Sequence, residues 1–321
     1  MIDVSVIVPI HNAEKYLRKS IGSIQAQDVQ NIEILCLDDG STDNTLQILR
    51  ELQAEDDRIK VFSREDRGYG ITMNELLDLT EGQYVINVDP DDWIEPDMFT
   101  KMLSEMDKDV DYVKCSFVYE CKEGQLNYYY SDDAVEFCPR KLNYDMKARF
   151  FSSQVAIWTC MIRRSFIEKR RIRFNPTPGA AYQDTAFLFQ LNACANKVRV
   201  LPDVLYHYNK LNDNASTLST RYPFAPVIEY NFMTDWSMKH PRYGMYVRSV
   251  LCKCRLGSYM WNMTRIEPKD RKPFADLVRQ DFRNDWNWLD VRMFSEKEFN
   301  AFKCGMRDPE AFIDLCLRRE R

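Results

Sequence analysis

The 321-residue chain lacks the features of membrane-spanning proteins, of secreted proteins and of proteins with histidine-containing catalytic or zinc sites. No stretch reaches the roughly 18 to 20 uninterrupted apolar residues of a membrane span, and no charged-then-apolar start predicts a signal peptide. The three histidines, His11, His207 and His240, are too scattered for a catalytic triad or a zinc site. We therefore expect a cytoplasmic protein.

Glycine is also scarce, and the chain has no surplus of positive charge. No Gly-x-Gly-x-x-Gly run follows the first apolar segment, which argues against a dinucleotide-dependent dehydrogenase. The glycine-rich basic loop of a sugar-nucleotide nucleotidyltransferase is missing there too, so that class is the weaker alternative. The net charge of −5 argues against a nucleic-acid partner. The ten cysteines lack the paired spacing of a zinc site, and we expect buried thiols.

Strand and helix signals alternate through the first hundred residues. Short apolar runs at 4–9, 32–37, 59–62 and 84–88 are separated by helical patterns at 13–25, 45–52 and 72–79. Near-continuous apolar strands between helices predict an α/β fold whose mostly parallel sheet is flanked by helices.

The rest of the chain is mixed and then helical. Strand-like runs occur at 112–119, 155–158 and 204–208, with a helical pattern at 184–195. Beyond residue 209 the pattern is mostly helical. We expect one domain over residues 1–217 and a helical C-terminal region over residues 218–321.

Polar residues gather where the first strands end, and ligands bind at that edge of a parallel sheet. The ends carry Pro9-Ile-His-Asn12, Asp38-Asp39 and Asp89-Pro-Asp-Asp92. Two carboxylates in a turn can hold a hard divalent cation such as Mg²⁺ or Mn²⁺. An aspartate at a strand end can accept a hydrogen bond from a base or a ribose. Alternatively, both acidic runs cap the helices that follow them.

Three linked segments resemble family 2 glycosyltransferases of the GT-A fold, in order and in spacing. They are Val4-Ser-Val-Ile-Val-Pro-Ile-His-Asn-Ala-Glu-Lys-Tyr-Leu17, Asp38-Asp-Gly-Ser-Thr-Asp43 and Asp89-Pro-Asp-Asp-Trp-Ile94. The resemblance implies an inverting transferase that moves a sugar from a nucleoside-diphosphate donor, expected to be a UDP-sugar. The acceptor would be a hydroxyl of a saccharide or lipid-linked molecule in cell-surface polysaccharide assembly. A non-catalytic nucleotide- or sugar-binding module of the same fold is the alternative.

The resemblance also implies roles for single residues. Asp184, in Tyr182-Gln-Asp-Thr-Ala-Phe187, matches the catalytic base of the family, unless it only caps the next helix. Asp91 matches the metal ligand, supported by Asp89, which would also lie near the ribose. The positions that would contact the nucleotide sugar are Pro9, His11, Asp39, Asp66 and Asp89.

Several of these positions depart from the usual family residues. His11 stands where Tyr is common, Asp66 replaces Asn, and Gln183 replaces the Glu beside the base, which should make Asp184 easier to ionise. Met73 replaces an Arg of the family, so Arg64 or Arg67 would have to supply that positive charge.

A basic stretch follows in the C-terminal region. Residues 241–272 hold eight basic and two acidic residues, with aromatic residues interleaved. Such a stretch suits peripheral contact with an anionic membrane, here the inner face of the cell membrane. The alternative is a solvated helical face with its aromatic rings buried inward.

Overall fold

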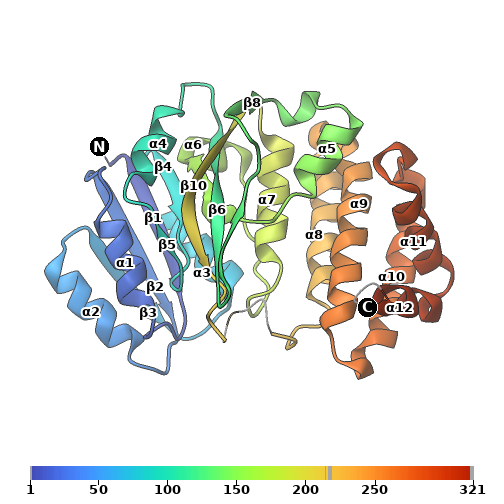
Figure 1. Ribbon diagram of the computed structural model, residues 1–321, viewed down its shortest axis with the longest axis horizontal. Coiled ribbons are helices and arrows are strands. Elements are labelled where there is room, and N and C mark those ends of the chain that lie inside the picture. The colour runs from blue at the N-terminus through green and yellow to red at the C-terminus, as the bar shows by residue number, and fades with distance from the viewer. Residues whose placement is uncertain (1, 214, 216–218, 319–321) are drawn as a thin grey trace. The chain divides into compact units, whose positions relative to one another are not determined.

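The computed structural model describes residues 2–213, 215 and 219–318 of the chain, shown in Figure 1. The backbone contacts divide it into two units. The first unit comprises Met1–Cys138, Ala156–Gln183 and Ala195–Ala215, and the second Pro139–Val155, Asp184–Cys194 and Ser216–Arg321. The predicted boundary between residues 217 and 218 lies outside the described residues and stays a prediction.

A ten-stranded sheet runs through the first unit, in the order β3-β2-β1-β4-β9-β6-β10-β5, with β7 beside β6 and β8 beside β10. Its first four strands are parallel, as the sequence predicts. They are β1 (Val4–Ile10), β2 (Ile32–Asp39), β3 (Ile59–Arg64) and β4 (Tyr84–Asn87). Every residue of β1 and β2 is buried. Because side chains alternate between the two faces of a strand, both faces of the sheet are covered here.

The second half of the sheet is mixed, which the sequence pattern did not predict. β6 (Tyr112–Cys121) and β10 (Val198–Asn209) are parallel to each other. The strands that join them are antiparallel: β5 (Trp93–Ile94), β7 (Gly124–Tyr128), β8 (Val135–Phe137) and β9 (Cys160–Arg163). The strand predicted at 155–158 is wrong. A 3₁₀ turn, η2 (Ile157–Thr159), precedes β9 there, and the Trp158 ring stacks on Tyr206 at 4.3 Å between centroids.

The described residues of the first unit form the helices α1 (Leu17–Gln25), α2 (Thr45–Glu55), α3 (Tyr69–Leu79), α4 (Met98–Ser104) and α6 (Arg164–Arg170). Leu17, Ile21 and Ile24 of α1 are buried at the spacing of one helical face. Helices α1, α2 and α3 join the parallel strands β1 to β4, so the loops that enter these helices lie at the carboxyl edge of the sheet.

The second unit is helical, as predicted for the C-terminal region. It contains α5 (Tyr144–Phe151), most of α7 (Gln183–Cys194), α8 (Ala225–Lys239), α9 (Pro241–Arg265), α10 (Pro268–Asp285), α11 (Glu296–Arg307) and α12 (Pro309–Leu317). Short 3₁₀ turns, η4 (Trp286–Trp288) and η5 (Val291–Met293), connect α10 to α11. Inside the unit the buried Arg255 guanidinium donates to Asp285 at 2.8 Å. None of the described helices combines the length and apolar character needed to cross a membrane.

The basic stretch 241–272 falls on α9 and the start of α10. Tyr243 and Tyr259 are buried and so is Arg255, whereas Trp261 is exposed. These two tyrosines therefore point inward, as the second interpretation of this stretch predicts. The described side chains of this stretch therefore do not form one continuous basic and aromatic face.

Candidate active site

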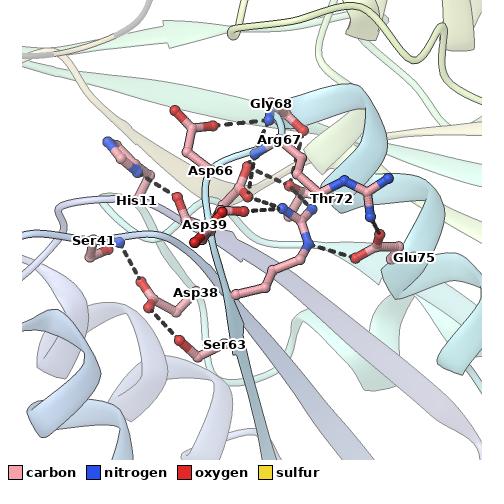
Figure 2. Close-up of polar contacts among 12 residues, drawn as sticks. His11, Asp38, Asp39, Ser41, Ser63, Asp66, Arg67, Gly68, Thr72 and Glu75 are labelled. Carbon is pink, nitrogen blue, oxygen red and sulfur yellow. Dashed lines mark hydrogen bonds and ion pairs between the residues drawn. The ribbon is translucent and has the colours of Figure 1, made fainter.

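Asp39, at the end of β2, is the centre of a hydrogen-bond network at the carboxyl edge of the sheet (Figure 2). Its side chain accepts from the backbone N–H groups of Arg67 and Gly68 at 2.9 and 3.1 Å, and from the Thr72 hydroxyl at 2.7 Å. Arg64 completes the set through an ion pair with Oδ1. A carboxylate offers about four acceptor positions, so donors of the chain itself fill Asp39. A nucleotide that bonds to this carboxylate has to displace one of them.

Arg64 is held by two carboxylates. Its Nε donates to Glu75 at 2.7 Å, and its Nη2 donates to Thr72 at 2.9 Å, in addition to the pair with Asp39. Arg67 pairs with the other oxygen of Glu75 at 2.9 Å. Met73, which replaces the arginine of the family, is buried. Of the two candidates for the missing charge, Arg64 is thus the one that contacts Asp39 with its side chain.

His11 lies beside Asp39, in the loop that follows β1. Its Nδ1 donates to the Asp39 carbonyl oxygen at 2.8 Å, and its Nε2 accepts from the Asn12 side chain at 3.1 Å. This pattern corresponds to the neutral imidazole with its hydrogen on Nδ1. Asn12 has a φ of 51° and bridges to the next loop, since its Oδ1 accepts from the Thr42 N–H at 2.8 Å. The exposed His11 ring is therefore fixed at the edge of the sheet, while Pro9 is buried in β1.

The loop between β3 and α3 needs its glycines. Asp66 is exposed and accepts from the Gly68 N–H at 3.0 Å. Gly68 has a φ of 92°, and a Cβ there would lie 2.8 Å from the Gly179 nitrogen. A Cβ on Gly70 would lie 2.1 Å from the Asn175 oxygen. The Gly68-Tyr69-Gly70 sequence lets this segment pack tightly against residues 175–179.

Asp92, in the acidic run after β4, has a structural task. This buried side chain accepts from the Tyr206 hydroxyl at 2.7 Å and from the Asn209 N–H at 2.7 Å. Tyr206 in turn accepts from the Asp89 N–H at 3.1 Å. Helix α4 begins at Met98, so the interpretation of the acidic run as its cap is wrong. The run is instead tied to β10.

Asp91 is the carboxylate of this run that suits a cation. Its Oδ2 accepts from the Asn212 amide at 2.7 Å, and burial raises its pKa. The pKa of Asp92 is raised well above its usual value by burial and by the charges of Asp91 and Asp89. Across the described residues no lysine or arginine is ion-paired with Asp91. A divalent cation would offset this concentrated negative charge.

The protein supplies only some of the ligands that such a cation needs. No group of three or more His, Cys, Asp or Glu side chains suited to a metal lies in the described part of the chain. Mg²⁺ is usually held by one or two carboxylates together with substrate phosphates and water. Asp89, whose Oδ1 accepts from Asn87 at 2.9 Å, is the second carboxylate of this run at the predicted spacing.

Asp184 lies in the first turn of α7, in the second unit. Its Oδ1 accepts from the Thr185 N–H at 2.7 Å, and burial raises its pKa. This direction opposes the easier ionisation expected from Gln183. Gln183 donates to Thr177 at 3.0 Å and to the Gly179 oxygen at 3.2 Å. An ionised glutamate could not make these donations, which gives the substitution a structural reason.

The structure thus gathers His11, Asp39 and the acidic run at the ends of adjacent strands, in one unit. Sequence reasoning missed the residues that hold them in place: Glu75, Thr72, Tyr206, Asn209 and Asn212. Their only signal was polar character beside predicted elements.

Comparison with known proteins agrees with this edge-of-sheet arrangement. The profile described as Glycosyl transferase family 2 matches residues 5–171, which include every strand end described above. The chain belongs to glycosyltransferase family 2. It is 32% identical to EpsH of Bacillus subtilis over 213 residues, 64% of this chain and 60% of EpsH. It is 29% identical to the glycosyltransferase GlyG of Streptococcus pneumoniae, over 64% of this chain and 70% of GlyG.

Solved structures confirm the GT-A fold of this family 2 chain. S. aureus TarS (residues 1–349), crystallised with UDP-GlcNAc, superposes with a TM-score of 0.81 at 19% identity, over 99% of this chain and 92% of TarS. A mannosyltransferase of Pyrobaculum calidifontis, in complex with GDP-Man and Mn²⁺, superposes with a TM-score of 0.54 at 15% identity, over 98% of this chain and 83% of that one. At these identities the likeness concerns the fold.

Proposed function

We propose that this chain is an inverting glycosyltransferase that transfers a sugar from a UDP-sugar to a hydroxyl of a saccharide or lipid-linked acceptor. We place this reaction in the assembly of a cell-surface polysaccharide, at the inner face of the cell membrane. The observation that carries the proposal is the meeting of His11, Asp39 and the Asp89–Asp92 run at the ends of β1, β2 and β4. TarS, of the same fold, binds UDP-GlcNAc, which supports a nucleotide-sugar donor.

The donor end would be held by the residues of that edge. The flat ring of His11 is suited to stack on the base, and Pro9 and Asp66 line the same edge. Asp39 would accept a hydrogen bond from the base or the ribose once Arg64 releases one of its contacts. Arg64, freed from Asp39 but still paired with Glu75, could then donate to the nucleotide.

The leaving diphosphate needs its growing charge offset. Asp91, supported by Asp89, would hold Mn²⁺ or Mg²⁺, which supplies this compensation as a Lewis acid. The Asn212 amide keeps one Asp91 oxygen in position, and Asp92 anchors the loop to β10 through Tyr206.

Proton transfer is assigned to Asp184. Its carboxylate takes the proton of the acceptor hydroxyl as that oxygen forms a bond to the anomeric carbon. The bond from this carbon to the diphosphate breaks on the opposite face, and its electron pair leaves with the nucleoside diphosphate. The raised pKa of Asp184 makes it a stronger base than an ordinary aspartate.

The test is a donor screen with manganese that measures release of nucleoside diphosphate in the wild type and two variants. We expect Asp91→Ala to lose activity at ordinary metal concentrations, and Asp184→Asn to lose about 100-fold or more of kcat while it still binds donor. Asp97→Ala is the matched control, because Asp97 is a half-exposed carboxylate of the same segment paired with Lys101. Full activity in both site variants would refute the assignment. Donor binding without any turnover in the wild type would favour the non-catalytic module.

A further inference from the structure

A cluster of exposed aromatic and apolar side chains lies on the second unit, where α5, α9 and the turns η4 and η5 meet. Trp288 is 45% exposed, Val291 53% and Tyr144 41%. An arginine packs over each of the two rings. The Arg248 guanidinium lies 4.0 Å from the centre of the Trp288 ring, and the Arg292 guanidinium lies 3.8 Å from that of Tyr144. We call these five residues the Trp288 surface; Figure 1 shows the helices α5 and α9 that carry part of it.

The Trp288 surface is held in a fixed arrangement. The Ser249 hydroxyl of α9 donates to the Trp288 carbonyl oxygen at 2.7 Å. Arg292 donates to the Tyr144 hydroxyl at 2.6 Å, which joins η5 to α5. The apolar side chains are therefore presented by ordered elements. Their exposure to water costs free energy that polar side chains at the same positions would not cost.

Positive charge surrounds this surface in a chain that is acidic overall. Three segments form this surface and its rim. They contain seven basic and two acidic residues in all and comprise residues 139–155, 241–250 and 286–293. Both acidic residues are ion-paired, Asp145 with Arg149 and Asp290 with Arg292. Arg140 and Arg242 flank the Tyr243 ring at 5.8 and 5.9 Å, on the first turn of α9. The net charge of −5 is thus reversed locally.

From this combination we infer that the Trp288 surface binds the surface of an anionic lipid bilayer. Tryptophan and tyrosine favour the boundary between water and lipid, and arginine and lysine bind anionic headgroups. Protein interfaces are depleted of lysine, whereas the rim of this surface contains Lys141 and Lys147, which favours a lipid surface over a protein partner. The surface differs from the basic stretch 241–272, since it takes only the first turns of α9 and adds α5 and the η4–η5 turns. The inference rests on the proposed membrane location, but not on the donor or the chemistry.

Vesicle sedimentation tests the inference with the full chain. We expect binding to mixed phosphatidylglycerol–phosphatidylcholine vesicles and little binding to phosphatidylcholine alone. Trp288→Ala should weaken the partition about tenfold, as expected for the loss of a large half-exposed ring. Arg248→Gln and Arg292→Gln should each weaken it about five-fold, and added salt should weaken it further.

Trp261→Ala is the matched control. Trp261 is 49% exposed and also lies 4.0 Å from an arginine, Arg265. It lies 13 residues after Arg248 on α9, about 20 Å along the helix axis. The Trp261→Ala substitution should therefore leave vesicle binding unchanged. The variants' thermal unfolding and nucleoside-diphosphate release in solution should match the wild type, so vesicle binding and donor turnover can fail separately.

Equal binding to both kinds of vesicle, no binding at all, or a loss with Trp261→Ala instead of Trp288→Ala would overturn the inference. So would a dimer in sedimentation equilibrium that Trp288→Ala dissociates.

Discussion

At the scale of single residues, the acidic side chains of this chain do different work according to their surroundings. Asp39 accepts four hydrogen bonds and organises a loop, and Asp92 bonds to Tyr206 and Asn209 to anchor another. Asp91 and Asp184 have raised pKa values, as Asp92 does, because burial disfavours their ionised forms, and no ion pair compensates Asp91 or Asp184 among the described residues. Carboxylates kept in that condition are costly to folding and are typical of functional sites.

The raised pKa values of Asp184 and Asp91 predict a pH dependence of activity. A general base works when ionised, and a metal ligand binds when ionised, so activity should fall as pH decreases through each raised pKa. The acid limb of kcat/KM should therefore lie above the ordinary aspartate range near about 4. Kinetics at two manganese concentrations separate the two groups. Excess metal competes with the proton for Asp91, so the part of the acid limb that reports Asp91 should move to lower pH. The part that reports Asp184 should stay at the same pH. An acid limb below about pH 4 would contradict the prediction.

At the scale of elements, the loops at the strand ends are shaped by close backbone contacts as well as by side chains. The loop from Arg64 to Thr72 surrounds Asp39 and packs on residues 175–179 through Gly68 and Gly70. A side chain on either glycine would meet backbone atoms, which cannot move aside as a flexible side chain can. The Gly-Tyr-Gly sequence is therefore a packing requirement of this site.

Two glycine substitutions within helices test that requirement. Gly70→Ala should destabilise the protein by about 1–3 kcal/mol, because its Cβ would lie 2.1 Å from the Asn175 oxygen. Gly22→Ala in α1 is the control, since nothing lies within 4 Å of its Cβ. It should stabilise the protein by about 0.5–1 kcal/mol, as alanine replaces glycine in a helix. Urea unfolding measures both. Equal effects of the two substitutions would show that the backbone relieves the contact with Asn175 at little cost in free energy.

At the scale of the whole molecule, the chain divides differently in space than along the sequence. Pro139–Val155 and Asp184–Cys194 belong with the C-terminal helices, although they fall inside the predicted N-terminal domain of residues 1–217. The reason is packing, because apolar faces on α5 and α7 are buried against helices that come much later in the chain. Phe189 of α7, for example, meets Trp236 of α8 edge-on at 5.9 Å.

Ligand binding should raise the stability of the whole protein if the site works as proposed. A ligand at about a hundred times its Kd stabilises the native state by about 2.7 kcal/mol, which raises Tm by several degrees. We expect UDP with manganese to produce this rise in the wild type. In Asp91→Ala the manganese-dependent part should be lost, while Asp97→Ala should respond as the wild type does. Thermal unfolding with UDP alone, manganese alone and both together measures the effect. A full response in Asp91→Ala would place the metal elsewhere.

Much of this protein could be predicted from the sequence because its signals are local. The parallel strands β1 to β4 read as short apolar runs between helices, and the motifs at their ends place Asp39, Asp89 and Asp91 at one edge. Parallel strands bring their carboxyl ends together whatever the rest of the chain does. The family and the fold could be inferred for this reason.

Other features depend on contacts between distant segments, and only the tertiary structure decided them. The antiparallel strand β9 enters the sheet between β4 and β6, and Asp92 finds its partners more than a hundred residues away on β10. The saturation of Asp39 by Arg64 and Thr72 and the joining of Tyr144, Arg248 and Trp288 on one surface are of the same kind. A residue's neighbours across the fold set whether its charge is paired, buried or exposed, and no local pattern contains them.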